Sequence, residues 1–377
     1  MSASDAGLYA GIISGTSMDG IDCVVVQLQD NQLELIASNT FKYPSELRGR
    51  LFQACATPTL PLLELGQLDI AVGQCFAHSL NQLLQAHGLR PDQIRAIGSH
   101  GQTVFHAPQV EYPFSLQIGD PNTIATQTGI TTVADFRRRD MSAGGQGAPL
   151  APLFHQFFFH KPGINRCVLN IGGISNITWI GSKPDDAPVG FDTGPGNVFM
   201  DMWTEQWLGQ PYDKNGDWAA SGNINEALLQ TFMQEPYLAA PSPKSTGREL
   251  FNRQWLEQKL HGFDGVSKED VQRTLLEFTA RSIAGAIKAS WPDTSDNTSE
   301  LLVCGGGAHN GMLMQRLQDL LPQMKVSTTA DHGMPADWIE ASTFAWLAAK
   351  TINREKIDTT ALTGARHSVI LGGIYYA

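Results

Sequence analysis

Cysteine is sparse in this 377-residue chain, and long apolar runs are absent. The five cysteines stand apart, without a CxxC pair, at positions 23, 55, 75, 167 and 304. This spacing argues against a zinc site or a disulfide framework and fits a reducing cytoplasm. The first residues lack the basic and apolar regions of a secretory signal, and no apolar stretch approaches the roughly 18 residues that span a bilayer. We therefore expect a cytoplasmic protein without a membrane partner.

Positive charge is also scarce. Lys and Arg total 26 against 37 Asp and Glu, which gives a formal net charge of −11. This balance argues against nucleic acid and anionic membranes as partners. An anionic small molecule would need a local group of basic residues.

Two common nucleotide-binding signatures are missing. No segment matches the Walker A pattern with its lysine, which argues against a P-loop fold. The glycine cluster Gly305–Gly307 does not complete a dinucleotide fingerprint, because Asn310 replaces its last glycine. A dehydrogenase is therefore poorly supported.

The length predicts two domains, since single cores rarely grow so large. Strand signals alternate with helix signals, which indicates α/β layers. Helical apolar spacing runs from Leu65 to Leu83, and again from Val271 to Ile287. The run GGQGAP breaks regular structure within residues 133–150, so we predict domains at 1–133 and 134–377, with a ligand cleft between them.

Three glycine-rich turns follow apolar strands. The first lies between two apolar runs and predicts a hairpin; its candidate phosphate ligands are Gly15, Thr16, Ser17, Met18, Asp19, Gly20, Ile21 and Asp22. The turn Gly172-Gly173 repeats the design, and Gly305, Gly306 and Gly307 precede a helix. Taken alone, each of these segments fits an ordinary structural turn nearly as well as a phosphate-binding turn. Together they suggest two related domains that face one nucleotide.

Asp192 is the strongest candidate for catalysis. It ends an apolar strand and precedes a turn with Gly194, Gly196 and Asn197 that opens a helix. Such a turn presents N–H groups to an anion, and Asp192 at its edge is placed to act as a general base. The structural alternative is an aspartate that caps the helix.

Asp19 and Asp22 are candidates for metal binding and for turn formation. Asp19 at the turn could hold Mg²⁺ through water, because Mg²⁺ keeps much of its hydration. Asp22 either belongs to the phosphate site or only fixes the turn, by accepting from backbone N–H groups.

Candidate sugar-binding residues are scattered along the chain. Ser99, His100 and Gln102 follow a predicted strand over residues 94–98, where their polar groups suit hydroxyls. The run DFRRRD is the densest basic segment, and guanidinium groups suit carboxylate or phosphate. The alternatives are a structurally satisfied histidine and a solvated charged face. Glu340 is either a surface acid or a hydroxyl acceptor.

Taken together, these segments resemble a known family. The motifs GIISGTSMDGID, SHGQT, QIGD, ADFRRRD, GGQGAPL, NIGGISN, GFDTGPGN, KSTGRE and CGGGAHN are similar to those of anhydro-N-acetylmuramic acid kinases, within the acetate and sugar kinase, Hsp70 and actin superfamily. The resemblance implies two related α/β domains of the ribonuclease H-like type. It also implies ATP and Mg²⁺ as cofactors, a homodimer, and a role in bacterial cell-wall sugar recycling.

The resemblance further implies a reaction and roles for residues. The family hydrolyses the bridge of 1,6-anhydro-N-acetylmuramic acid and phosphorylates O6, giving N-acetylmuramic acid 6-phosphate and ADP. Asp192 would activate water, and Gly305–Gly307 would face adenosine. The implied substrate-binding residues are Ser99, His100, Gln102, Asp120, Asp135, Arg137 and Glu340. An ordinary hexose or amino-sugar kinase without the hydrolytic step is the nearest alternative, whereas a chaperone or filament protein would need further domains or insertions.

Overall fold

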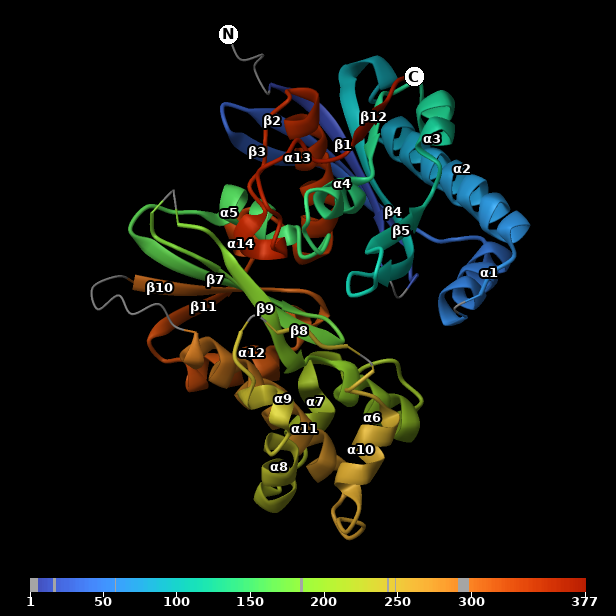
Figure 1. Cartoon of the computed structure of the whole chain (residues 1–377). Coiled ribbons are helices and arrows are strands. Elements are labelled where there is room, and N and C mark those ends of the chain that lie inside the picture. Colours follow the sequence, from blue (N-terminus) through green and yellow to red (C-terminus); the bar gives the residue numbers. More distant parts are fainter. Residues whose placement is uncertain are drawn as a thin grey trace. The chain divides into compact units, whose positions relative to one another are not determined.

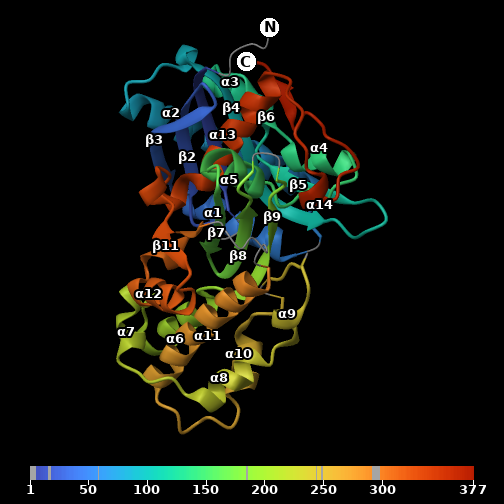
Figure 2. The same ribbon diagram turned by 90° about the vertical axis from the view of Figure 1, so that its left-hand side faces the viewer.

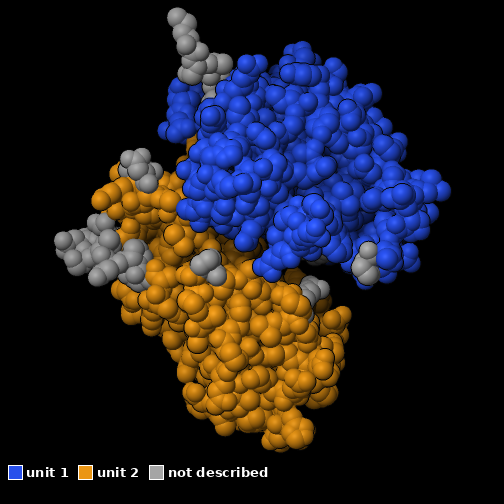
Figure 3. Space-filling view, in the orientation of Figure 1, with its two compact units in different colours: residues 1–154, 337–377 blue, residues 155–336 orange. Residues whose placement is uncertain are grey.

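Each half of the chain is built on a mixed β-sheet. The computed structural model describes residues 6–15, 18–57, 59–183, 186–242, 244–247, 249–290 and 298–377. The chain divides into unit 1, residues 1–154 with 337–377, and unit 2, residues 155–336. Figure 3 shows the two units in blue and orange.

The helices and strands are labelled in Figure 1 and shown from a second side in Figure 2. Unit 1 contains β1 (Gly7–Ser14), β2 (Ile21–Gln29), β3 (Gln32–Phe41), α1 (Ser45–Ala56), α2 (Leu62–Ala86), η1 (Pro91–Gln93), β4 (Ile94–Ala107), β5 (Phe114–Ile118), α3 (Pro121–Thr128), β6 (Thr132–Ala134), α4 (Phe136–Ser142), α13 (Ile339–Ile352), α14 (Thr360–Thr363) and β12 (Gly373–Tyr375). Unit 2 contains β7 (Ile164–Ile171), β8 (Ile174–Ile180), β9 (Val189–Pro195), α6 (Val198–Leu208), η2 (Lys214–Gly216), α7 (Asp217–Ala220), α8 (Glu226–Met233), α9 (Pro236–Ala239), α10 (Arg253–Leu260), α11 (Lys268–Ala289), β10 (Thr298–Cys304), η3 (Gly306–His309), α12 (Gly311–Leu320), β11 (Met324–Thr328) and η4 (Ala330–His332). Helix α5 (Ala151–Phe159) and turn η5 (Ala336–Trp338) cross the divisions between units.

The two sheets share one strand order. Unit 1 has the order β3-β2-β1-β4-β6, and unit 2 has β9-β8-β7-β10-β11. In each, the first three strands are antiparallel neighbours and the last two join in parallel. Unit 1 adds β12 beyond β6 and β5 beside β4. The repeated order confirms the predicted fold class, two related α/β units.

The division of the chain differs from the predicted boundary. The loop with Gly144 and Gly145 lies inside unit 1, because the buried Asp140 carboxylate accepts from the Gly147 amide and from the hydroxyls of Thr359 and Thr363. These bonds connect the loop to the end of the chain. The C-terminal segment therefore returns to the first unit, and the structure divides after residue 154 instead of 133.

Helix α13 packs directly on the unit 1 sheet. In β1, Ala10 and Ile12 face the core beneath α2, so Gly11 between them faces the other side. A Cβ atom on Gly11 would collide with the Ala341 carbonyl of α13, and one on Gly98 of β4 with the Phe344 carbonyl. The two glycines therefore allow the α13 backbone to lie against both strands.

Candidate functional site

The first glycine turn joins β1 to β2 and is braced by Arg48 of α1. Arg48 donates from Nε to the Met18 carbonyl over 2.8 Å and pairs with Asp19 at 3.3 Å. Met18 adopts the left-handed conformation, with φ 53°, and its amide donates to the Gly15 carbonyl. Thr16 and Ser17 lie outside the described residues. The exposed Asp19 carboxylate is open to solvent, as a water-mediated metal contact would require.

Asp22 lies in β2, and its Oδ1 accepts from the Thr40 hydroxyl of β3 over 2.6 Å. Among the described residues of the turn, no N–H group donates to its side chain. Burial raises the pKa of Asp22, the Thr40 bond opposes that shift, and the charge of Asp337 adds to it. Asp22 therefore belongs to a group of acidic side chains near the start of α13.

In unit 2 the other three glycine-rich segments meet. The Gly196 and Val198 amides donate to the Gly173 carbonyl, and the Asn197 amide donates to the Gly172 carbonyl over 2.8 Å. A Cβ on Gly196 would collide with the Gly172 carbonyl. The N–H groups at the start of α6 are thus hydrogen-bonded within the site. The sequence had suggested instead that they point freely at an anion.

The Gly305–Gly307 turn completes this group. A Cβ on Gly305 would collide with the Asn170 side chain, and one on Gly307 would lie 3.2 Å from Oδ1 of Asn197. Asn197 also donates from Nδ2 to the Ile171 carbonyl over 3.1 Å. The turns at the ends of β7, β9 and β10 therefore form one continuous surface.

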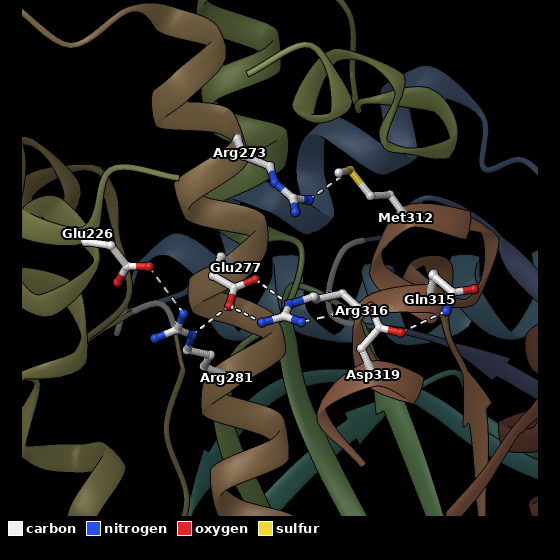
Figure 4. Close-up of polar contacts among 8 residues, drawn as sticks. All are labelled: Glu226, Arg273, Glu277, Arg281, Met312, Gln315, Arg316 and Asp319. Carbon is white, nitrogen blue, oxygen red and sulfur yellow. Dashed lines mark hydrogen bonds and ion pairs between the residues drawn. The ribbon is translucent and has the colours of Figure 1, made fainter. Parts of the chain in front are cut away.

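An ion-pair clamp fixes α12, the helix after this turn, against α11. Figure 4 shows Glu277 between Arg281 and Arg316. Glu277 is completely buried and accepts from Nε and Nη2 of Arg316 at 2.7 and 2.8 Å, and from Nε of Arg281 at 2.6 Å. Arg273 of the same helix donates to the Met312 sulfur in the first turn of α12. The clamp gives the glycine turn a rigid support.

Asp192 lies in β9 and holds the segment of residues 244–246. Its Oδ2 accepts from the Ser245 hydroxyl over 2.7 Å and from the Thr246 amide over 3.0 Å. Its backbone amide donates to the Lys244 carbonyl, and its own carbonyl accepts from the Tyr237 hydroxyl. No described residue hydrogen-bonds to Oδ1. Asp192 is therefore no cap of α6, and one carboxylate oxygen faces away from its fixed partners.

The protonation equilibrium of Asp192 is shifted. Burial raises its pKa, the Thr246 and Ser245 bonds oppose this shift, and the charge of Glu249 adds to it. A carboxylate with a raised pKa is a stronger base than an ordinary aspartate.

In unit 1, Arg137 of α4 meets His100 of β4. Arg137 donates from Nε to Nε2 of His100 over 2.8 Å, and from Nη1 to the Gly147 carbonyl over 2.9 Å. Desolvation raises the pKa of Glu340, and the charge of Arg137 opposes this shift. Part of the Glu340 side chain is nevertheless exposed to solvent. Arg138 and Arg139 are exposed. The structure thus separates one half-buried arginine from its two neighbours.

Of the other predicted sugar-binding residues, Gln102 and Asp120 have hydrogen-bonding partners, whereas the buried Ser99 hydroxyl has none among the described residues. The strand predicted to end before Ser99 continues to Ala107, so Ser99 and Gln102 lie buried within β4, and Gln102 donates to the Gly15 carbonyl. Asp120 is the N-cap of α3 and accepts from the amide and hydroxyl of Thr123.

Asp135 likewise has a partner: it accepts from the Tyr375 hydroxyl over 2.6 Å. These bonds leave Arg137, His100 and Glu340 as the coherent polar group of unit 1.

Ser245 and Asp140 were given no role of their own in the sequence analysis. Ser245, in the motif KSTGRE, donates to Asp192. Asp140 was visible only as part of a charge run. A contact between side chains so distant in sequence leaves no local pattern.

Within the described ranges, no group of three or more His, Cys, Asp or Glu side chains is arranged to hold a metal ion. In the same part of the chain, no helix has the length and apolar character needed to cross a membrane.

Comparison with known proteins gives a consistent result. The family model described as anhydro-N-acetylmuramic acid kinase matches residues 7–377. A protein of that name from Vibrio cholerae serotype O1 is 50% identical over 369 residues, covering 98% of this chain and 98% of the relative. One from Pasteurella multocida is 48% identical over 367 residues, covering 97% and 96%.

Proposed function

The chain belongs to the anhydro-N-acetylmuramic acid kinase family, and from this premise we propose that it opens 1,6-anhydro-N-acetylmuramic acid with water and phosphorylates O6. ATP is the phosphoryl donor. The hydrolytic step is supported by the geometry of Asp192, a half-buried carboxylate with one oxygen fixed by Ser245 and Thr246.

In the proposed reaction Asp192 accepts a proton from water. The water oxygen forms a bond to C1, and the C1–O6 bond breaks. O6 then attacks the γ-phosphorus of ATP, and the bond from phosphorus to the ADP oxygen breaks. The fixed Oδ2 keeps the carboxylate in one orientation, and burial raises its pKa, so both position and basicity suit a general base.

We assign sugar binding in unit 1 to Arg137 and Glu340. Nε and Nη1 of Arg137 are used by His100 and Gly147, and no described residue accepts from Nη2. That N–H group is directed to the lactyl carboxylate of the sugar. Glu340, open to solvent, accepts from a sugar hydroxyl.

We assign phosphate binding to the Gly15–Asp22 turn in unit 1 and to the Gly172-Gly173 and Gly194–Asn197 turns in unit 2, and adenosine binding to the Gly305–Gly307 turn. Phosphoryl transfer depends mainly on positioning and charge neutralisation. Because the Gly196, Asn197 and Val198 amides already donate to the Gly172 and Gly173 carbonyls, the unit 2 turns position the nucleotide, and we assign the backbone donors to the unit 1 turn. Bound Mg²⁺ would supply the remaining neutralisation. The exposed carboxylate of Asp19 fits a contact to its hydration shell, because Mg²⁺ in such sites keeps several waters.

The test is product analysis in ¹⁸O-labelled water with the anhydro sugar, ATP and Mg²⁺. The proposal predicts label on the anomeric oxygen and phosphate on O6. Phosphorylated sugar without label, or turnover only with open-ring hexoses, would favour the ordinary kinase reaction. Glu205→Gln, an exposed carboxylate of α6, is a control that should keep full activity.

Family membership also supports proposals about assembly and location. We propose a homodimer that acts in the bacterial cytoplasm in cell-wall sugar recycling. Sedimentation at micromolar concentration tests the first, since a monomer would contradict it.

A further inference from the structure

Helix α6 carries a carboxylate that the proposed reaction does not use, Asp201. Its amide donates to the Asn197 carbonyl over 2.8 Å, so Asp201 lies one turn after Asn197 on the same side of the helix. Asn197 borders the glycine turn of β10: Cβ atoms on Gly306 and Gly307 would lie 3.5 and 3.2 Å from its side-chain amide. Asp201 therefore continues the surface that this turn begins.

A second carboxylate faces Asp201 from the loop before η2. Asp213 is buried, and its two oxygens accept from the amides of Trp218 and Ala219, both at 2.9 Å. Gln272 of α11 also donates to Asp213, at 3.3 Å. These three donors fix the position of the Asp213 carboxylate.

The loop that carries Asp213 also touches α12. The Gly311 amide donates to Asn215 over 3.1 Å, and a Cβ on Gly216 would lie 2.8 Å from Cβ of Met312. The loop that carries Asp213 thus contacts the first turn of α12, and the charge of Asp213 acts on Asp201 of α6.

Asp201 differs from Asp213 in having no hydrogen-bonding partner among the described residues for its carboxyl group. Burial raises its pKa to about 7, and the charge of Asp213 adds to this shift. Three cations on elements near α6 have other partners. Arg253 of α10 donates to Gln206, and Lys268 of α11 lies over the Trp207 ring. Arg273 of α11 donates to Met312. His309 of η3 is exposed to solvent.

A neutral carboxyl group offers an O–H donor beside a C=O acceptor. Adenine offers the matching pair, a ring nitrogen that accepts beside an amino group that donates. Gly306 in this turn is exposed, and a Cβ there would meet only the Asn197 side chain, at 3.5 Å, so a flat ring has room to lie against it. We propose that Asp201 recognises the base of the nucleotide, donating to an adenine ring nitrogen and accepting from its amino group. This inference rests on the nucleotide site proposed for unit 2.

Calorimetry with two ligands tests it: ADP, and purine riboside 5′-diphosphate, which lacks the amino group. We expect the wild type to bind ADP about tenfold more tightly, as the loss of one good hydrogen bond implies. Asp201→Ala should bind both equally. Asp201→Asn keeps a donor and an acceptor, so it should retain the preference.

The pH dependence of binding separates this role from a structural one. The wild-type affinity for both ligands should decrease more than that of Asp201→Asn as the pH rises from 6 to 8, because the ionised carboxyl loses the O–H that donates to the ring nitrogen of either ligand. The diphosphate titrates in the same way in both proteins, so its contribution cancels in this comparison. An equal pH dependence of the two proteins would contradict the role.

Glu205→Gln, one turn further along α6, is the matched control and should behave as wild type. Thermal unfolding confirms that each variant is folded. Equal wild-type affinities for the two ligands, or a preference that survives in Asp201→Ala, would overturn the inference. The experiment in ¹⁸O-labelled water tests the proposed function separately, because the reaction on the sugar does not depend on which side chain binds adenine.

Discussion

Arg137 donates its Nε–H to Nε2 of His100 over 2.8 Å, and this bond fixes the proton on the imidazole. Because Nε2 accepts, Nδ1 carries the proton and donates to the Gly101 carbonyl over 2.9 Å. Burial lowers the pKa of His100 well below its usual value, and the charge of Arg137 adds to this effect. His100 is therefore a neutral acceptor that orients the guanidinium group.

Replacing Arg137 should weaken sugar binding. Arg137→Lys keeps the charge but cannot serve His100, Gly147 and a substrate carboxylate together, because an ammonium group lacks the planar fork. Losing a hydrogen bond to a charged group costs about 1.5–3 kcal/mol, so KM for the anhydro sugar should rise at least about tenfold. Steady-state kinetics measures this. Arg138→Lys, at an exposed position, should change KM less than about twofold, and an equal effect of both variants would contradict the assignment.

Asp192→Asn should abolish most turnover. General bases contribute about 10²–10⁴ in rate, and kcat should fall within that range while ADP binding stays near wild type. In the wild type the base must be ionised. Since burial raises the pKa of Asp192, kcat/KM should decline with falling pH above the ordinary aspartate value of about 3.9.

Ser245→Ala provides a second test of the same base. It removes a bond that lowers the pKa of Asp192, so the acidic limb of the pH profile should move to higher pH. An unchanged profile would argue against Asp192 as the titrating base.

The Glu277 clamp should dominate the local stability of unit 2. Glu277→Ala leaves Arg281 and Arg316 without their shared partner, and breaking such a buried pair costs about 3 kcal/mol or more. Urea unfolding measures the change in the free energy of unfolding. Glu226→Gln removes only the exposed end of the network and should cost less than about 1 kcal/mol. Similar losses in the two variants would contradict a clamp.

The clamp should also depend on pH. Although burial opposes it, the bonds from Arg316 and Arg281 lower the pKa of Glu277. A glutamate with a lowered pKa stabilises the fold above its unfolded value of about 4.3, and this stabilisation is lost as the pH falls through the folded value. The wild type should therefore lose more stability on acidification than Glu277→Ala.

Two glycines should respond oppositely to the same substitution. Gly196→Ala brings a methyl group into the Gly172 carbonyl, so the turns of β7 and β9 must separate and ADP affinity should fall. Gly285→Ala lies at an open position of α11 and should stabilise the protein by up to about 1 kcal/mol. Calorimetry and thermal unfolding separate the two effects. Unchanged ADP affinity in Gly196→Ala would show that the turns do not hold the nucleotide.

Local patterns in the sequence predicted much of the fold. Helical spacing from Leu65 to Leu83 became α2, and spacing from Val271 to Ile287 became α11. Glycine turns after apolar strands predicted the ends of β1, β7 and β10. These features depend on neighbouring residues, which is why periodicity reveals them.

Contacts between distant segments were harder to predict. The return of the C-terminal segment depends on Asp140 accepting from Thr359 and Thr363, and nothing in the local run indicates it. One structural role was recognisable in the sequence. Asp120 precedes Pro121, and an aspartate followed by proline at the first helical position is a common start of a helix, which is the role it has.

The packing of α13 on Gly11 and Gly98 bears on the order in which the protein acquires its structure during synthesis. Unit 2 is one continuous segment, and all its strands leave the ribosome before α13 does. The sheet of unit 1, made early, has one face uncovered until that helix arrives from the far end of the chain. Strands β1 and β4 therefore lack the helix that covers this face for most of translation, and we expect this half of the protein to depend more on chaperones while it is incomplete.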